Sequence, residues 1–207
     1  VCFDKPFESL DGWADKECFP DIEELQGTTE STPRSDSGWS YHDAPTSGVS
    51  AQYQVRRGEQ VCLKMAVSYV SIANAKENLE TECNHWDFDK VRRDSQEEWN
   101  QWLGKIDVKG GTDAQKIKFY TDLWHTLLGR HKIDDCNGEY PDYTQGGTRK
   151  GTHTLNAECQ IRQLEKDKMG NSIHHMYNSD AFWLTQWNLN TLWGLAYPSV
   201  LDDFAAS

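Results

Sequence analysis

The stretch "WDFDKVRRDSQEEWNQWLGKIDVKGGTDAQKIKFYTDLWHTLLGR", residues 86–130, decides the fold class, because apolar residues recur in it at helical spacing. Its first half predicts a helix over residues 87–106. The apolar positions of this helix form one stripe: Phe88, Val91, Trp99, Trp102, Leu103 and Ile106. Charged and polar residues fill most of the other positions, as expected for a helix with one face on a core.

The second half of the stretch predicts another helix, with signals at both ends. Thr112 is followed three residues later by Gln115, which is the pattern of a capping box at a helix N-terminus. Gly129 suits the C-terminal end, where glycine readily adopts the backbone conformation required. The apolar stripe of this helix comprises Ile117, Tyr120, Trp124 and Leu127. His125 is adjacent to Trp124, and we expect a hydrogen-bonded core histidine there.

Residues 72–82, "IANAKENLETE", predict a shorter helix on the N-terminal side of this stretch. Ser71 is a suitable N-cap, since its hydroxyl can accept a hydrogen bond from the first turn. Ile72, Ala75 and Leu79 share one face at helical spacing. We therefore expect this helix to present an apolar face to its neighbours.

"SDAFWLTQWNLNTLWGLAYP", residues 179–198, predicts a fourth helix, with Ser179 as its cap and Pro198 just past its end. At about 100° per residue, its side chains divide into two faces. The mixed face contains Asp180, Trp183, Trp187, Asn190 and Gly194. The other face, which we expect to join the core, contains Phe182, Leu189, Trp193 and Ala196. Rings beside a carboxylate and an amide suit a sugar, which pairs apolar C–H patches with hydroxyls, but packing against another helix is the alternative.

The first 70 residues predict β-structure. Residues 49–55 alternate between apolar and polar, and residues 61–67 do the same, with the turn sequence "RRGEQ" between them. Alternation on both sides of a short turn that contains glycine is typical of a β-hairpin. We therefore predict a hairpin over residues 49–67, as the last strands of a β-sandwich.

Composition excludes several classes of partner. The 207-residue chain has a net charge of −12, and its Lys and Arg residues are scattered among acids. A surface that follows phosphates needs concentrated basic residues, so we expect no nucleic acid and no anionic membrane as partners. No apolar run approaches the ~20 residues that span a bilayer. The chain begins at Val1 without a leader-like segment, and we expect it to be cut from something longer.

Six cysteines are widely spread along the chain, and no C-x-x-C pair is present. This spacing excludes a zinc ribbon or a thioredoxin-type motif. An even number permits up to three disulfides, whose pairing stays open, and buried free thiols are the alternative. We expect a secreted or periplasmic, partly disulfide-bonded protein, in which Cys2 and Cys18 are the first pair to test.

Two polar segments are candidates for metal ligation. "DDCNGEYPD", residues 134–142, collects the hard oxygen ligands that calcium prefers: Asp134, Asp135, Asn137, Glu139 and Asp142. Their spacing departs from that of an EF-hand, and we expect an acidic turn. His174 and His175 are adjacent in "SIHHMYN", and because neighbouring side chains point apart in most conformations we expect a solvated loop.

Three segments resemble, in the same order, glycoside hydrolase family 92: "VSYVSIANAKENLETEC" (67–83), residues 86–140, which end in "CNGEY", and "FWLTQWNLNTLWGLAYP" (182–198). In that family a β-sandwich domain leads through a helical linker into an (α/α)6-barrel catalytic domain. The resemblance implies an α+β multidomain fragment. Residues 1–70 would be the C-terminal part of the sandwich domain, residues 71–106 the linker, and residues 107–207 the first part of the barrel.

The resemblance implies an inverting exo-α-mannosidase that needs calcium, thought to hold the mannose hydroxyls. Inverting hydrolysis uses two carboxyl groups about 6.5–9.5 Å apart, one of which protonates the leaving oxygen while the other activates water. In the family these carboxylates and the calcium ligands belong to motifs further downstream, which do not occur in these residues. We therefore expect no catalytic residue and no metal ligand in this chain.

The segment 182–198 resembles a sequence motif of the family, Ser-x-Trp-Asp-Thr-aromatic-Arg, whose side chains contact the terminal mannose. Trp183 and Thr185 match that motif, whereas Leu184 stands at the usual Asp and Trp187 at the usual Arg. Asp180 is a candidate replacement for the missing acid. The substrate-binding residues implied by this motif and by the mixed face are Trp183, Asp180, Thr185, Trp187 and Asn190.

The departures at Leu184 and Trp187 favour an alternative function from a different class. The chain would then be a non-catalytic carbohydrate-binding or structural assembly protein built on the same scaffold. Four predicted helices are fewer than the twelve of a closed (α/α)6 barrel. Both hypotheses therefore require the remainder of the polypeptide, or a partner chain, to complete the barrel and cover apolar surface.

Overall fold

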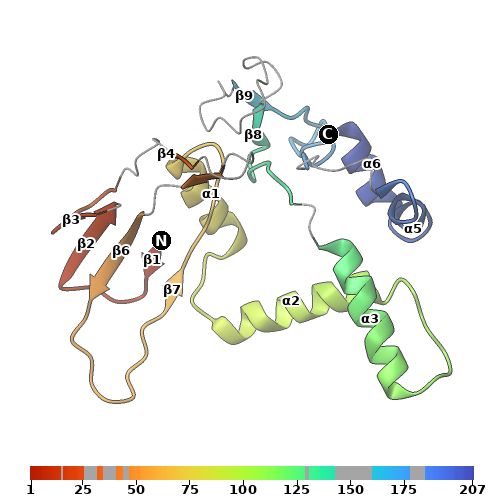
Figure 1. Cartoon of the computed structure of the whole chain (residues 1–207), viewed down its shortest axis with the longest axis horizontal. Coiled ribbons are helices and arrows are strands. Elements are labelled where there is room, and N and C mark those ends of the chain that lie inside the picture. Colours follow the sequence, from red (N-terminus) through yellow and green to blue (C-terminus); the bar gives the residue numbers. More distant parts are fainter. Residues whose placement is uncertain are drawn as a thin grey trace. The chain divides into compact units, whose positions relative to one another are not determined.

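The computed structural model describes residues 1–14, 16–25, 32–34, 41–43, 47–128, 131–142, 160–177 and 185–207. The chain divides into two compact units. Unit 1 comprises Val1–Met65 and Tyr143–Cys159, and unit 2 comprises Ala66–Asp142 and Gln160–Ser207. The mixed α+β class is confirmed (Figure 1). The barrel and the three-part division at residues 70 and 106 stay predictions.

Unit 1 is built from short antiparallel strands. Its three-stranded sheet has the order β3-β2-β6, and β1 pairs with β7 and β4 with β5 in two smaller sheets. The strands are β1 (Cys2–Phe3), β2 (Ser9–Ala14), β3 (Glu17–Phe19), β4 (Thr32–Arg34), β5 (Tyr41–Asp43), β6 (Ser47–Gln52) and β7 (Leu63–Lys64). The prediction of β-structure in this part of the chain is thus confirmed.

The predicted hairpin over residues 49–67 is wrong in its pairing. A turn does form at Gly58, which has a φ of 84°, but β6 pairs with β2 and β7 pairs with β1. The ring of Tyr53 packs edge-on against Phe3 and Phe7, with centroids 5.7 and 6.4 Å away. Alternation predicts which side chains share a face, but the strand partner depends on such long-range contacts.

Cys2 and Cys18, the first pair to test, do not form a disulfide. Both residues are exposed free thiols. Cys2 lies on β1, whose partner is β7, whereas Cys18 lies on β3 opposite Trp13. The two cysteines therefore belong to different sheets.

Unit 2 contains five helices among its described residues (Figure 1). They are α1 (Ile72–Glu82), α2 (Phe88–Leu103), α3 (Asp113–Leu127), α5 (Leu189–Ala196) and α6 (Pro198–Ala206), and a two-stranded sheet of β8 (Glu139–Asp142) and β9 (Gln160–Gln163) accompanies them. Two predicted caps are confirmed. Ser71 accepts a hydrogen bond from the Asn74 N–H at 3.0 Å, and Thr112 and Gln115 form the capping box of α3. No described helix is both long and apolar enough to cross a membrane.

The core of unit 2 is aromatic. Leu123, Trp193, Tyr197 and Phe204 are buried together, and the C-terminal half of α2 packs against them through Trp102 and Leu103. The stripes predicted for α2 and α3 are only half correct, since Phe88 is 74% exposed and Ile117 67% exposed. The Tyr197 hydroxyl donates to the Trp102 carbonyl at 3.0 Å, which links the C-terminal helices to α2.

The fourth predicted helix, 179–198, is shorter than expected in the described residues. Ser179 lies outside them, and α5 begins only at Leu189. Pro198 opens a further helix, α6, as its first residue, where its missing N–H is not needed. A Cβ at Gly194 would lie 3.4 Å from Leu201 on α6, which is an ordinary van der Waals contact. The predicted core face of this helix is confirmed by Trp193, Leu189 and Ala196.

The structure differs from two further expectations for single residues. His125 is exposed rather than part of the core, because the buried side of α3 runs through Leu123. The apolar residues predicted to share one face of α1 are not its most buried ones, since Ile72 is 62% exposed while Asn74 and Asn78 are buried. Gly129 lies outside the described residues.

Candidate functional site

The predicted sugar-binding residues are only partly visible in the structure. Trp183 and Asp180 lie outside the described residues, as does Leu184. Thr185 is buried, at 4% exposed, whereas Trp187 is 77% exposed. Trp187 precedes α5 and Asn190 lies in its first turn, so the two are close in sequence but do not share a regular helix.

Asn190 has an unusual environment for an amide. Its Oδ1 atom is buried and has no hydrogen-bond partner among the described residues. A buried acceptor without a partner is costly, by about 1–3 kcal/mol. Asn190 thus has a buried acceptor without a partner among the described residues, whereas the ring of Trp187 is exposed. With Thr185, these are the described members of the predicted binding set.

An aromatic pocket lies beside the core of unit 2. It has a volume of about 320 Å³, within the usual range for small-molecule sites. Its walls include the rings of Trp99, Trp102, Trp193 and Tyr177, with Glu98 and Lys132 as charged neighbours. The Nε1–H of Trp193 is buried and has no acceptor among the described residues. The sequence indicates Trp99 and Trp102 only as a helix stripe, not as pocket walls.

The side chain of Tyr177 lines this pocket, and its phenol stays protonated at neutral pH. Burial, followed by the negative charges of Asp203 and Asp134, raises the pKa of Tyr177 to about 12. Its hydroxyl therefore acts as a hydrogen-bond donor and not as a base. With one carboxylate and one phenol, the walls of the pocket are suited to binding a ring-shaped ligand rather than to the two-carboxylate chemistry of inverting hydrolysis.

The acidic turn 134–142 is held to α1 by side-chain hydrogen bonds. The buried carboxylate of Asp135 accepts from the Asn78 amide at 2.7 Å, the Asn74 amide at 2.9 Å and the Ser68 hydroxyl at 2.6 Å. The Cys136 N–H donates back to the Asn78 Oδ1 at 2.9 Å. The expected turn is confirmed, with Gly138 at a φ of 84°. These contacts explain why the buried face of α1 is polar.

Metal ligation by these residues does not fit their geometry. Both Asp135 oxygens accept hydrogen bonds from amide or hydroxyl donors, and Glu139 accepts one from Asn74 at 2.8 Å. A calcium ion needs such oxygens turned toward itself. In the part of the chain that the structure describes, no group of three or more His, Cys, Asp or Glu side chains is arranged to hold a metal. We therefore derive no step through calcium from these residues.

His175 is paired rather than merely solvated. Its Nδ1 lies 2.9 Å from Asp134 Oδ2, and the other Asp134 oxygen accepts from the Met176 N–H at 2.8 Å. The Nδ1 of His174 contacts the His175 carbonyl oxygen instead. The two rings thus have different partners, in agreement with the expectation that they point apart, while the Asp134 contact was not predicted. It ties residues 131–135 to residues 174–177.

The Asp134 carboxyl makes the free energy of unfolding depend on pH in the acidic range. Burial raises its pKa, but hydrogen bonds from His175 and Met176 and the charge of His175 outweigh burial and lower it below the ordinary value. A lowered pKa stabilises the fold above the ordinary carboxyl pKa of about 3.9, and this stability is lost as pH falls through the lowered value. We expect the wild type to be more stable than Asp134→Asn at pH 5, and this difference in unfolding free energy to shrink as the pH falls below about 4.

Chemical denaturation at a series of pH values measures this difference. The matched control is Asp107→Asn, whose side chain is 71% exposed and should leave the unfolding free energy nearly unchanged. A wild-type advantage over Asp134→Asn that stays constant down to the lowest pH at which the protein is folded would contradict the prediction.

Comparison with known proteins places the chain among glycosidases. The family model described as "Glycosyl hydrolase family 92 catalytic domain" matches residues 74–207. A protein from Arthroderma benhamiae, described as an uncharacterized secreted glycosidase, is 28% identical over 171 residues. That match covers 76% of this chain and 22% of the relative.

Two solved structures share the fold. One is a family 92 inverting mannosidase from Bacteroides thetaiotaomicron, with a TM-score of 0.66 and 20% identity over 99% of this chain and 23% of its own. The other is a family 92 glycosyl hydrolase with a TM-score of 0.62 and 17% identity, over 97% of this chain and 22% of its own. The chain thus spans less than a quarter of the length of each of these relatives.

Proposed function

The chain belongs to glycosyl hydrolase family 92, and from this premise we propose that it forms part of an enzyme that cleaves terminal α-mannosyl residues from glycans by calcium-assisted inverting hydrolysis. One observation carries the proposal, namely the match of the family's catalytic-domain model to residues 74–207. The likeness of the fold to that of an inverting mannosidase supports the choice of substrate and stereochemistry.

Binding rather than bond cleavage is the role proposed for this chain's residues. Trp187 would stack its exposed ring on the apolar face of a mannose. Asn190, whose Oδ1 has no partner among the described residues, is the second contact proposed from the first turn of α5. Trp183, Thr185 and Asp180 would complete the contact. Because Thr185 is almost fully buried, its part would be to hold the loop before α5.

The two catalytic carboxylates and the calcium ligands are not assigned to this chain. In inverting hydrolysis one carboxylic acid protonates the leaving oxygen, and a carboxylate on the opposite side of the sugar activates the attacking water. Calcium would hold the mannose hydroxyls, through ligands outside the described residues. The remainder of the same polypeptide, or a partner chain, would supply these groups and complete the barrel.

A location outside the cytoplasm is part of the proposal. The relative from Arthroderma benhamiae carries the description "secreted", and glycans are common substrates in that compartment. We therefore propose that the protein works as a secreted or periplasmic enzyme.

The sequence just before α5 favours one competing function. Leu184 and Trp187 stand where the family motif usually has Asp and Arg, and this favours a non-catalytic carbohydrate-binding or assembly protein on the same scaffold. The two functions differ in one property, since only the enzyme releases mannose.

Release of mannose from an aryl α-mannoside tests the proposal. The protein is expressed from its complete reading frame and assayed in calcium and after treatment with a chelator. We expect turnover in calcium, a loss of at least about tenfold with chelator, equivalent to about 1.4 kcal/mol, and recovery when calcium is restored. Absence of turnover in calcium, with glycan binding retained, would reject the enzyme and support the binding protein.

A further inference from the structure

Trp13 occupies an unusual position in the three-stranded sheet of unit 1. Gly12, its neighbour on β2, faces Ile22 and Leu25, so that a Cβ at Gly12 would lie only 2.4 Å from the Ile22 side chain. Because successive side chains on a strand point to opposite faces, Trp13 lies on the other face of the sheet. There it is 40% exposed. A large indole therefore stands on the face that Ile22 and Leu25 do not cover.

The strand register identifies the neighbours of this indole. Trp13 is paired with Cys18 on β3 and with Gly48 on β6, and Asp11 is paired with Ser50. Residues directly opposite one another in antiparallel strands share a face. We call this set of five residues, Asp11, Trp13, Cys18, Gly48 and Ser50, the Trp13 face. Apart from Trp13, its side chains are small or polar, whereas the opposite face carries Leu10, Val49 and Ala51.

The indole is seated in a defined position. Gly48 has no side chain, and a Cβ there would lie 2.7–2.9 Å from the Trp13 ring atoms Cζ2, Cε2 and Nε1. The ring therefore rests directly against the backbone of β6. It borders a surface pocket of about 450 Å³, whose walls also include Asp11, Cys18, Phe19 and Ser50. That volume lies within the usual range for small-molecule sites.

Asp11 places a fixed acceptor beside the ring. Its Oδ2 accepts from the Gln52 amide at 3.0 Å and its Oδ1 from the Asp21 N–H at 3.2 Å. Each carboxylate oxygen keeps capacity for another donor. Asp11 and Trp13 are two residues apart on one strand, so their side chains are separated by about 7 Å. The pocket surface is almost entirely apolar, so a ring-shaped ligand would rest mainly on the indole, with Asp11 as one lining residue.

The charge of the pocket selects among ligands. Among its described lining residues, Asp11 is the one charged side chain, and none is Lys or Arg. Such a pocket repels phosphate and carboxylate ligands and favours hydroxyl donors. A pyranose combines an apolar C–H face for the indole with hydroxyls for Asp11 and Ser50. We propose that the Trp13 face is a glycan-binding site in unit 1 that takes a pyranose residue of a neutral glycan.

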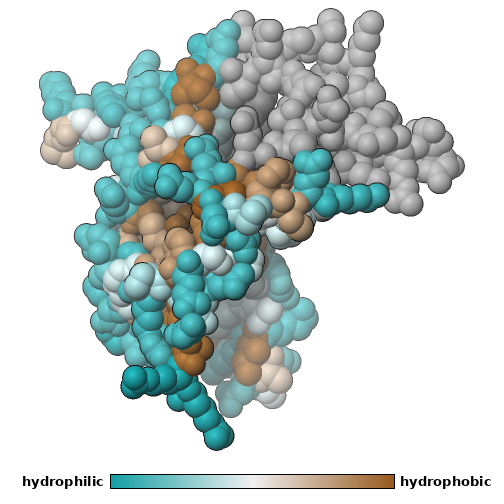
Figure 2. All heavy atoms as spheres, turned by 90° about the vertical axis from the view of Figure 1, so that its left-hand side faces the viewer, coloured by the Kyte–Doolittle hydropathy of each residue, from teal (hydrophilic) through white to brown (hydrophobic). Residues whose placement is uncertain are grey.

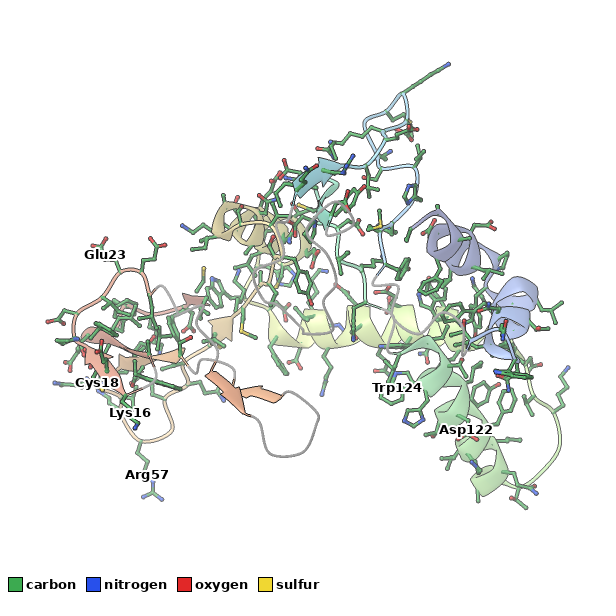
Figure 3. All side chains as sticks on the ribbon, turned by 45° about the horizontal axis from the view of Figure 1, so that its top comes forward. Lys16, Cys18, Glu23, Arg57, Asp122 and Trp124 are labelled. Atoms are coloured by element: carbon green, nitrogen blue, oxygen red, sulfur yellow. The ribbon has the colours of Figure 1, made fainter. Side chains whose placement is uncertain are left out.

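Cys18 allows this site to be tested without any mutation. Figure 3 shows Cys18 at the surface of unit 1, and it is an exposed free thiol that lines the pocket. Its alkylation by iodoacetamide is followed by peptide mass spectrometry with mannotriose, cellotriose or maltotriose present. Cys2, a second exposed thiol of unit 1, is the internal control. The Cys18 rate should be halved when the sugar concentration equals its dissociation constant, while the Cys2 rate stays unchanged.

A pair of variants links the protection to the indole. Trp13→Ala should weaken sugar binding by about five- to tenfold, as expected for loss of one aromatic contact. The matched control is Trp86→Ala, because Trp86 is 42% exposed against 40% for Trp13 and lies in unit 2. If none of the three sugars slows the labelling of Cys18 selectively, or if Trp13→Ala keeps full protection, the proposal is overturned. Since the readout is a thiol in unit 1, this result is independent of mannosidase activity.

Discussion

Trp193→Ala should destabilise unit 2 by about 3–5 kcal/mol, the usual cost of truncating a buried tryptophan. Trp193 is 1% exposed and packs edge-on against Phe204 at 5.7 Å between ring centroids. It also belongs to the buried cluster with Leu123 of α3, against which Trp102 and Leu103 of α2 pack. A cavity of that size next to the existing aromatic pocket removes contacts that no neighbour can restore.

Guanidinium unfolding followed by circular dichroism measures this loss. Trp187→Ala is the matched control, because Trp187 lies six residues away and is 77% exposed, so its removal should change the unfolding free energy by less than about 0.5 kcal/mol. Trp193→Phe should cost much less than Trp193→Ala, since the Nε1–H that it removes has no acceptor among the described residues. Equal losses for Trp193→Ala and Trp187→Ala would contradict the described core.

Asp135→Ala should cost about 3 kcal/mol, because it leaves three buried or half-buried donors without their acceptor. Those donors are the amides of Asn74 and Asn78 and the hydroxyl of Ser68. The loss should appear as earlier unfolding of α1 and the turn at residues 134–142. Hydrogen exchange of the α1 amides is the measurement.

Two further variants separate hydrogen bonding from other effects. Asp107→Ala removes a carboxylate that is 71% exposed and should change stability by less than about 0.5 kcal/mol. Asp135→Asn keeps the size of the side chain but turns one acceptor into a donor, so a clear loss there identifies hydrogen bonding as the cause. If the α1 amides of Asp135→Ala exchange at the wild-type rate, the hydrogen bonds of Asp135 do not stabilise this helix.

Local signals in the sequence predicted local structure well. Ser71 and the Thr112–Gln115 pair cap their helices as expected, because each cap involves residues only three positions apart. Periodicity identified α2 and α3, but it does not tell how far along a helix the neighbours extend. Phe88 and Ile117 therefore lie on the predicted stripes and yet are exposed.

Long-range partners could not be predicted in the same way. Asn74 and Asn78 are polar residues in a helix, and their burial follows from Asp135, 61 and 57 positions away. The pairing of β6 with β2 rather than with residues 61–67 likewise depends on a distant strand. Pro198 lies just past the end of one helix, as predicted, but it also starts another, which a single proline does not reveal.

The candidate site was predicted more by composition than by geometry. Trp193 and Leu189 belong to the core as expected, whereas Trp187 stands before α5 and is exposed. The face drawn in Figure 2 is mostly hydrophilic, with hydrophobic groups among the hydrophilic ones. A single exposed indole such as Trp13 gives no clear signal in the sequence. Only the strand register brings it together with Asp11 and Ser50.

The anomeric configuration of the released sugar tests the central claim most directly. The protein, expressed from its complete reading frame, is mixed with an α-mannoside in calcium, and proton NMR spectra are recorded before the product mutarotates. An inverting family 92 enzyme should release β-mannose first, with α-mannose following only by mutarotation. Initial release of α-mannose would contradict inversion, and release of no mannose would contradict the proposed hydrolysis.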